Sequence, residues 1–156
     1  MKNIRSVKEA SAAGDASFNA ADRLAIINLF GTYAQSYDAG KLDEFRSVFA
    51  DKVELKFMSG DQVAVDGLAQ LTPAMTERVK AFEAAKIQRR HALTSYAFTG
   101  QTDNEARGRL YFQVFTSKDG SVPSVALTGY YEFTAVKEGN TWKFSRWIAR
   151  GDQPLG

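Results

Sequence analysis

Apolar and polar positions along the chain follow a helical period first and a strand period later. A helix start is expected where Asn19 precedes Asp22 by three residues, because such a pair typically caps a helix. Small or apolar residues then recur at three- and four-residue spacing as far as an acidic position. They are Leu24, Ile27, Gly31, Ala34 and Asp38. This stripe predicts one face of a helix, which Gly40 would end.

Shorter elements are expected after this helix. Residues 42–49, LDEFRSVF, keep the helical period with apolar side chains at positions 42, 45 and 49. Strict alternation then takes over in Val53, Leu55 and Phe57, which predicts a strand. The turn SGD follows, and QVAV after it predicts a second, short strand.

The pattern changes for good after one more helix. That helix is expected from about 72 to 86, with Pro73 in its first turn and Met75, Val79 and Phe82 on its buried side. Four long strands are expected beyond it, separated by the turn-rich segments GQTDN, SKDGS and KEGN: 88–99, 105–116, 122–136 and 141–150. Helices followed by an antiparallel meander predict an α+β domain with its helices on one face of a curved sheet.

Length and composition fit one domain with an internal pocket. Of 156 residues, 44% are hydrophobic and 12% aromatic, enough to fill a core and line a cavity as well. We expect a flexible arm at residues 1–19 and a single domain at 20–156. Basic and acidic residues, 20 and 18, are mixed along the chain, so no nucleic-acid partner is expected. No apolar run suggests a signal peptide or a membrane span, and a cytoplasmic location is the default expectation.

The chain lacks the residues that several kinds of catalysis require. The chain has no Cys, which excludes thiolate catalysis, iron–sulfur ligation and thiolate zinc sites. It has a single His and no phosphate-binding glycine loop, GxSxG elbow or HExxH motif. Acid–base chemistry on a small organic molecule, with neither metal nor cofactor, is what remains.

Asp38 and His91 are the candidates for that chemistry. Imidazole titrates near neutrality, and a carboxylate that accepts from one ring nitrogen fixes the tautomer of the other. The two together would form a general base. The alternatives are that Asp38 only caps the turn DAGKLDEF and that a lone histidine is structural.

Two tyrosines and two arginines are further candidates. Tyr33 and Tyr37 lie one helical turn apart, where they could donate hydrogen bonds to a carbonyl oxygen or simply be core residues with a polar tip. Arg146 and Arg150 share strand parity with the apolar residues of 141–150, which predicts that one or both point toward the covered face. Alternatively, Arg150 is solvated or pairs with Asp152.

A basic cluster at the start of the first long strand has a simpler interpretation. It consists of Lys86, Arg89 and Arg90. We expect a solvated edge between helix and strand here, with an anion site as the lesser alternative.

Several segments within about 20–150 follow one another in a recognisable order: SYDAGKLDEFRSVFADKVEL, RRH, EARGRLYFQ, GYYEF and GNTWKFSRWIAR. Their order and spacing resemble the SnoaL-like branch of the nuclear transport factor 2-like (cystatin-like) superfamily, whose members are cone-shaped α+β domains that enclose a pocket. The chain looks most similar to scytalone dehydratases and bile-acid 7α-dehydratases, and less so to polyketide cyclases.

The resemblance implies roles for particular residues. SYD and RRH match the segments that carry an Asp–His dyad in these dehydratases, which implies catalytic roles for Asp38 and His91. Tyr37 is similar to the tyrosine before that aspartate in scytalone dehydratases, whereas Tyr33 resembles the catalytic tyrosine of the bile-acid enzyme. Arg150 resembles the latter's pocket arginine.

Departures from the family pattern fall in the implied substrate pocket. Val114 replaces a second active-site aspartate of the bile-acid enzyme, and Leu110 is the nearest match to a second histidine of scytalone dehydratase. With Phe112 they would make an apolar wall. Phe57 and Tyr131 stand where scytalone dehydratase has Tyr and Asn, and the strand VELKF lacks the base of ketosteroid isomerases.

A function and its alternatives follow from the resemblance. We expect a cofactor-independent lyase that dehydrates a hydrophobic hydroxy-carbonyl compound, in a homodimer formed through the open face of the sheet. A cyclase or isomerase remains open. So does a non-catalytic ligand-binding protein related to the small subunits of ring-hydroxylating dioxygenases.

Overall fold

The computed structural model describes residue 14 and residues 16–154, so most of the predicted arm, 1–19, lies outside the described residues. The helices are α1 (Ala20–Ala39), α2 (Leu42–Ser47) and α3 (Leu68–Ala84). The strands are β1 (Phe49–Ser59), β2 (Gln62–Asp66), β3 (Ile87–Gln101), β4 (Glu105–Lys118), β5 (Ser124–Glu138) and β6 (Thr141–Gly151). No helix in this described part is long and apolar enough to cross a lipid bilayer.

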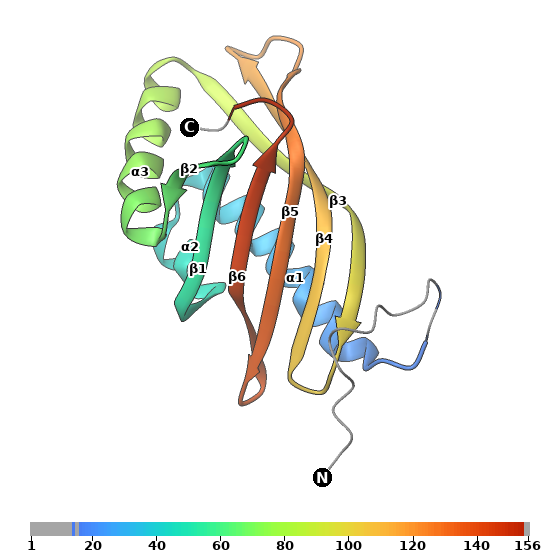
Figure 1. Ribbon diagram of the computed structural model, residues 1–156. Coiled ribbons are helices and arrows are strands. Elements are labelled where there is room, and N and C mark those ends of the chain that lie inside the picture. Colours follow the sequence, from blue (N-terminus) through green and yellow to red (C-terminus); the bar gives the residue numbers. More distant parts are fainter. Residues whose placement is uncertain (1–13, 15, 155–156) are drawn as a thin grey trace.

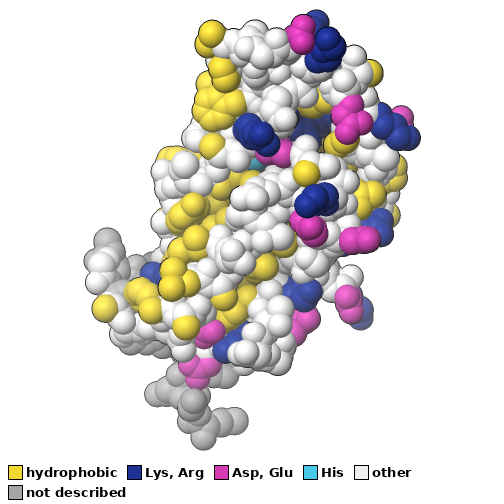
Figure 2. All heavy atoms as spheres, turned by 180° about the vertical axis from the view of Figure 1, so that it is seen from behind, with side chains coloured by type: hydrophobic (Ala, Val, Ile, Leu, Met, Phe, Trp, Pro, Cys, Tyr) yellow, Lys and Arg dark blue, Asp and Glu magenta, His cyan; other side chains and the backbone are white. Residues whose placement is uncertain are grey.

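The strands form one strongly curved sheet in the order β2-β1-β6-β5-β4-β3 (Figure 1). Neighbours pair antiparallel except β1 and β6, which are parallel. Helix α1 crosses one face of the sheet, and α3 lies near its β2 end (Figure 1). Figure 2 shows the molecule from the side that carries α1. The predicted α+β fold, with helices on a mixed and mostly antiparallel sheet, is confirmed.

Helix α1 has the predicted ends but buries a different face. The Asn19 side chain accepts from the backbone N–H of Asp22 at 3.1 Å, and Gly40 ends the helix with φ of 67°, a left-handed conformation that favours glycine. The predicted stripe is buried only in part: Leu24 is 66% exposed and Gly31 is exposed, whereas Ala34 is buried.

The buried face consists of Ile26, Phe30, Tyr33 and Tyr37, together with Ala34. Burial follows the aromatic rings because they remove the most apolar area from water. Gly31 has no such area to bury, so this position remains on the outer side of the helix.

Helices α2 and α3 differ from their predicted bounds. Phe49 begins β1 instead of closing α2. Helix α3 starts at Leu68, so Pro73 lies inside it and not in its first turn. Met75 is buried as predicted, whereas Phe82 is only half-buried, since its ring faces the cavity described below.

A bulge in β6 reverses which side chains face the helices. Thr134 pairs with Arg146 and Ala135 pairs with Phe144, so Ser145 is an extra residue in the strand. Such a residue shifts the alternation by one position. Phe144 before the bulge and Trp147 after it are therefore both fully buried.

Candidate functional site

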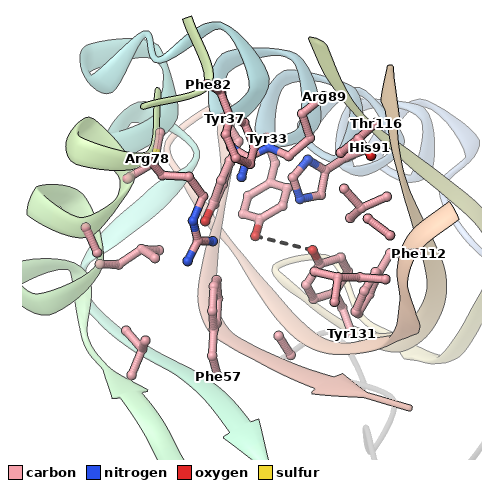
Figure 3. Close-up of a pocket in the computed structure, with 18 of the residues that line it drawn as sticks. Tyr33, Tyr37, Phe57, Arg78, Phe82, Arg89, His91, Phe112, Thr116 and Tyr131 are labelled. Atoms are coloured by element: carbon pink, nitrogen blue, oxygen red, sulfur yellow. Dashed lines mark hydrogen bonds between the residues drawn. The ribbon is translucent and has the colours of Figure 1, made fainter. Parts of the chain in front are cut away.

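A cavity of about 260 Å³ opens between α1, α3 and the concave face of the sheet (Figure 3). Its volume is near the lower end of the roughly 300–1,000 Å³ typical of small-molecule sites. Most of its wall is apolar, and the predicted residues Phe57, Phe112, Val114 and Tyr131 belong to it. Its polar lining side chains are Tyr33, Tyr37, Arg78, Arg89, His91, Thr116 and Tyr131.

Asp38 and His91 meet at one wall of this cavity. Imidazole Nδ1 lies 2.5 Å from carboxylate Oδ1, and the backbone N–H of His91 donates to Oδ2 at 2.7 Å. The Asp38 side chain is 6% exposed and the His91 side chain 8% exposed. Both carboxylate oxygens are therefore engaged away from bulk water.

Local structure accounts for this meeting. Asp38 lies in the last turn of α1, one residue before the helix ends and two before Gly40 reverses the chain. Arg89 and His91 are two apart near the start of β3, so their side chains point to the same side of the strand. The end of α1 and the start of β3 therefore lie next to each other at Asp38 and His91.

Arg89 completes a buried triad with Asp38 and His91. Its Nε lies 3.4 Å from Asp38 Oδ1, and its side chain is 6% exposed. The guanidinium stacks 4.6 Å above the centre of the Tyr37 ring. The interpretation of Arg89 as part of a solvated edge is therefore wrong, although Lys86 and Arg90 are indeed exposed.

The dyad has the geometry of an oriented base. A carboxylate only accepts hydrogen bonds, so the proton of the neutral imidazole is assigned to Nδ1, which donates to Asp38. The other nitrogen, Nε2, then carries a lone pair. Because His91 lines the cavity, that lone pair is available to a molecule bound there.

Three tyrosines surround the His91 ring on the cavity side (Figure 3). The ring centre of Tyr37 is 4.8 Å from that of His91, and that of Tyr33 is 6.4 Å away. The Tyr33 and Tyr131 hydroxyls lie 3.4 Å apart in a hydrogen bond. Burial raises the pKa of all three phenols, so they are protonated hydrogen-bond donors at neutral pH.

Two predicted pocket residues lie elsewhere. Arg150 follows the bulge at Ser145, so its side chain points away from the cavity and its Nε lies 3.5 Å from Glu132. Its assignment to the pocket is therefore wrong. Leu110 is fully buried in the core but does not line the cavity.

Arg78 and Thr116 line the cavity without having been predicted. Arg78 follows Leu71 and Met75 by seven and three residues, so it shares their helix face, and this spacing was visible in the sequence. Thr116 had a weaker signal, because it shares strand parity with Phe112 and Val114. Among the described residues, no three His, Asp or Glu side chains are grouped as a metal site would require.

Comparisons with solved structures support the fold. A protein of unknown function with a cystatin-like fold from Nostoc punctiforme is 18% identical, with 86% of this chain and 94% of that chain covered and a TM-score of 0.69. A protein provisionally assigned as a scytalone dehydratase from Novosphingobium aromaticivorans is 18% identical, with coverage of 86% and 87% and a TM-score of 0.64.

A third similar structure comes from the same organism. It is the beta subunit of a provisionally assigned aromatic-ring-hydroxylating dioxygenase, 15% identical, with coverage of 86% and 92% and a TM-score of 0.68. At these identities the likeness concerns the fold alone. No curated protein gives a match.

The family of the chain is given by a sequence-family model and not by the structural similarities. The model of the SnoaL-like domain matches residues 19–148, which include α1, all the cavity walls up to β6, and both members of the Asp38–His91 dyad. The chain belongs to the SnoaL-like domain family.

Proposed function

We propose that this protein is a cofactor-independent lyase that dehydrates a hydrophobic hydroxy-carbonyl compound. The observation that carries the proposal is the Asp38–His91 contact of 2.5 Å at the wall of an apolar cavity. A buried carboxylate that orients the only imidazole toward enclosed space is suited to removing a proton from carbon. The chain's similarity to scytalone and bile-acid dehydratases at SYD and RRH agrees with this chemistry.

The reaction begins with proton abstraction. His91 Nε2 removes the proton from the carbon next to the substrate carbonyl, and the C–H electrons form an enolate. Asp38 holds the imidazole in place and stabilises the imidazolium that results. Arg89 in turn holds the carboxylate, so it is a positioning residue.

Elimination then returns the dyad to its starting state. The enolate electrons form the carbon–carbon double bond as the bond to the β-hydroxyl oxygen breaks. The proton on Nε2 passes to that oxygen, which leaves as water. One base thus serves both steps when the proton and the hydroxyl leave from the same face.

We assign the Tyr37 hydroxyl group as the hydrogen-bond donor to the carbonyl oxygen of the substrate. Arg78 faces this hydroxyl group in the cavity, and its positive charge partly offsets the burial that raises the pKa of Tyr37 (Figure 3). Guanidinium can only donate hydrogen bonds, so Arg78 leaves the phenol proton free for the substrate. Tyr33 is less suited, because its hydroxyl already bonds to that of Tyr131.

The test is turnover by purified variants. Hydroxy-carbonyl compounds that fit the cavity are screened for water loss by mass spectrometry, and the best substrate is then offered to His91→Ala. The mechanism predicts lost turnover in a folded protein. Wild-type turnover by His91→Ala would refute it, and a rearranged product of unchanged mass would favour a cyclase or isomerase instead.

A non-catalytic role is the alternative from a different class. The fold is shared with the beta subunit of a provisionally assigned aromatic-ring-hydroxylating dioxygenase, and a subunit works within an assembly. Co-purification with an iron-containing large subunit, with no turnover by the isolated protein, would support that role. The enclosed dyad favours an enzyme, since an assembly subunit has no need of an oriented base.

We also propose that the protein is a homodimer that pairs through the open face of the sheet, opposite α1. This face carries the exposed ring of Tyr111, 55% accessible, and the charge ladder Glu54–Arg146–Glu132–Arg150. Sedimentation velocity of the protein and of Tyr111→Glu tests the proposal. A monomeric wild type would refute it.

A further inference from the structure

Arg78 brings a positive charge into the cavity from α3. Its side chain lines the cavity and extends from the helix toward the space between Tyr37 and Phe57 (Figure 3). Its positive charge acts on Tyr37, where it partly offsets the rise in pKa that burial causes. The surrounding wall is apolar, and Leu71, Ala74 and Met75 of the same helix belong to it.

Among the described residues, no carboxylate balances the charge of Arg78. The other cavity-lining cation, Arg89, forms an ion pair with Asp38. No Asp or Glu is among the residues that line the cavity, and no described carboxylate lies within ion-pair distance of Arg78. The nearest acidic neighbour in sequence, Glu77, pairs instead with Lys80 at 3.2 Å on the outside of the helix.

A cation in apolar surroundings is costly unless an anion accompanies it. We propose that Arg78 binds a carboxylate of the substrate, which is then an apolar ring bearing one carboxylate group. This inference rests on the proposed function for the identity of the site, and it adds the substrate class. The planar guanidinium suits the task, because one N–H can bond to Tyr37 while two others grip both carboxylate oxygens.

The placement of the two polar ends sets the orientation of the ligand. In Figure 3, Arg78 and His91 lie on different sides of the Tyr37 hydroxyl group. A ligand whose carboxylate meets Arg78 therefore presents its middle to Tyr37 and its far end to His91. Binding of the anionic end and proton removal at the other end are then separate tasks.

The test uses two probes of equal shape and different charge, 2-naphthoate and 2-naphthamide, with binding measured by isothermal titration calorimetry. Wild-type protein is expected to prefer the carboxylate by about 10- to 100-fold, as for hydrogen bonds to a charged partner. Arg78→Gln should abolish the preference, and Arg78→Lys should retain part of it. Lys80→Gln is the matched control, since it removes the same charge from the outer side of α3, where the side chain is 67% exposed.

Several outcomes would overturn the proposal. They are equal binding of the two probes to wild-type protein, no saturable binding of 2-naphthoate at millimolar concentration, and a carboxylate preference that survives in Arg78→Gln. The wild-type comparison stands even if a variant fails to fold. The same titrations in His91→Asn separate this inference from the proposed function: carboxylate preference there supports Arg78 whether or not the protein is a lyase.

Discussion

Two buried aspartates at opposite ends of α1 have closely similar surroundings. Asp22, in the first turn, accepts from Lys137 Nζ at 3.0 Å and from the indole N–H of Trp142 at 2.9 Å. Asp38, in the last turn, is held by the guanidinium of Arg89 and the ring of His91. Each carboxylate thus has one cation and one aromatic N–H for partners.

The partners differ in what they can do next. The indole of Trp142 has one nitrogen, which can only donate a hydrogen bond. The contact with Asp22 therefore only holds α1 against the end of the sheet. The imidazole of His91 has a second nitrogen, and it borders a cavity. Burial and ion pairing alone therefore do not distinguish the two carboxylates. Asp38 is our candidate because its partner is titratable and faces open volume.

The packing of side chains also differs between the middle of α1 and its Asp38 end. Between the middle of α1 and the sheet, Phe30, Phe133 and Phe144 pack with ring centres 5.1 to 6.0 Å apart and leave no cavity there. Beside Asp38 the sheet curves away toward α3 and leaves the cavity (Figure 1). The closed end stabilises the fold, and the open end leaves room for a ligand.

Removal of the His91 imidazole should have the largest effect on turnover. His91→Ala is expected to lower kcat by about 10² to 10⁴, the usual contribution of a positioned general base. Steady-state kinetics on the substrate identified by mass spectrometry measures the loss. Far-UV circular dichroism should show an intact fold; an unchanged kcat would make Asp38 as structural as Asp22.

Neutralising Asp38 should have the next largest effect. Asp38→Asn is isosteric but removes the charge that orients His91, and hydrogen bonds to charged groups contribute about 1.5 to 3 kcal/mol. We expect kcat to fall by about ten- to a hundredfold while KM changes little. Unchanged kinetics would remove Asp38 from the mechanism.

The matching change at the other end should affect stability only. Asp22→Asn leaves Lys137 without its counter-charge, and Lys137 is 25% exposed, so water offsets part of the loss. The free energy of unfolding should fall by about 1 to 2 kcal/mol in urea titrations. A kcat reduced as far as in Asp38→Asn would show that the two acids are not functionally distinct.

Removing the phenol proton donor should have the smallest effect. Tyr37→Phe is expected to lower kcat about two- to tenfold, the worth of one neutral hydrogen bond. Tyr33→Phe is the comparison, since the Tyr33 hydroxyl bonds to Tyr131 inside the wall. A larger kinetic loss for Tyr33→Phe would reverse our assignment of the two tyrosines.

Much of the secondary structure was predictable because it depends on neighbours in the chain. Asn19 and Gly40 mark the ends of α1, and the four long strands begin and end within a few residues of their predicted bounds. The imidazole could be selected because the chain has a single histidine, whereas Asp38 stood out among 18 acidic residues by its place at the end of the predicted helix. None of this required knowledge of distant contacts.

The positions of individual side chains were harder to predict from the sequence. Arg89 was predicted in solvent and lies buried against Asp38, and Arg150 was predicted inside and lies outside. Arg150 was misplaced because strand parity holds only for an unbroken ladder, and the bulge at Ser145 becomes visible only once β5 is paired.

Local geometry and composition were enough to predict the order and type of the helices and strands, the ends of α1 and the single imidazole available for acid–base chemistry. The folded protein was needed to show which face of α1 is buried, that Arg89 and Asp38 meet, and that Arg78 enters the cavity. Those outcomes depend on the packing of segments far apart in the chain, where large rings compete for burial and one extra residue in a strand turns every later side chain to the other face.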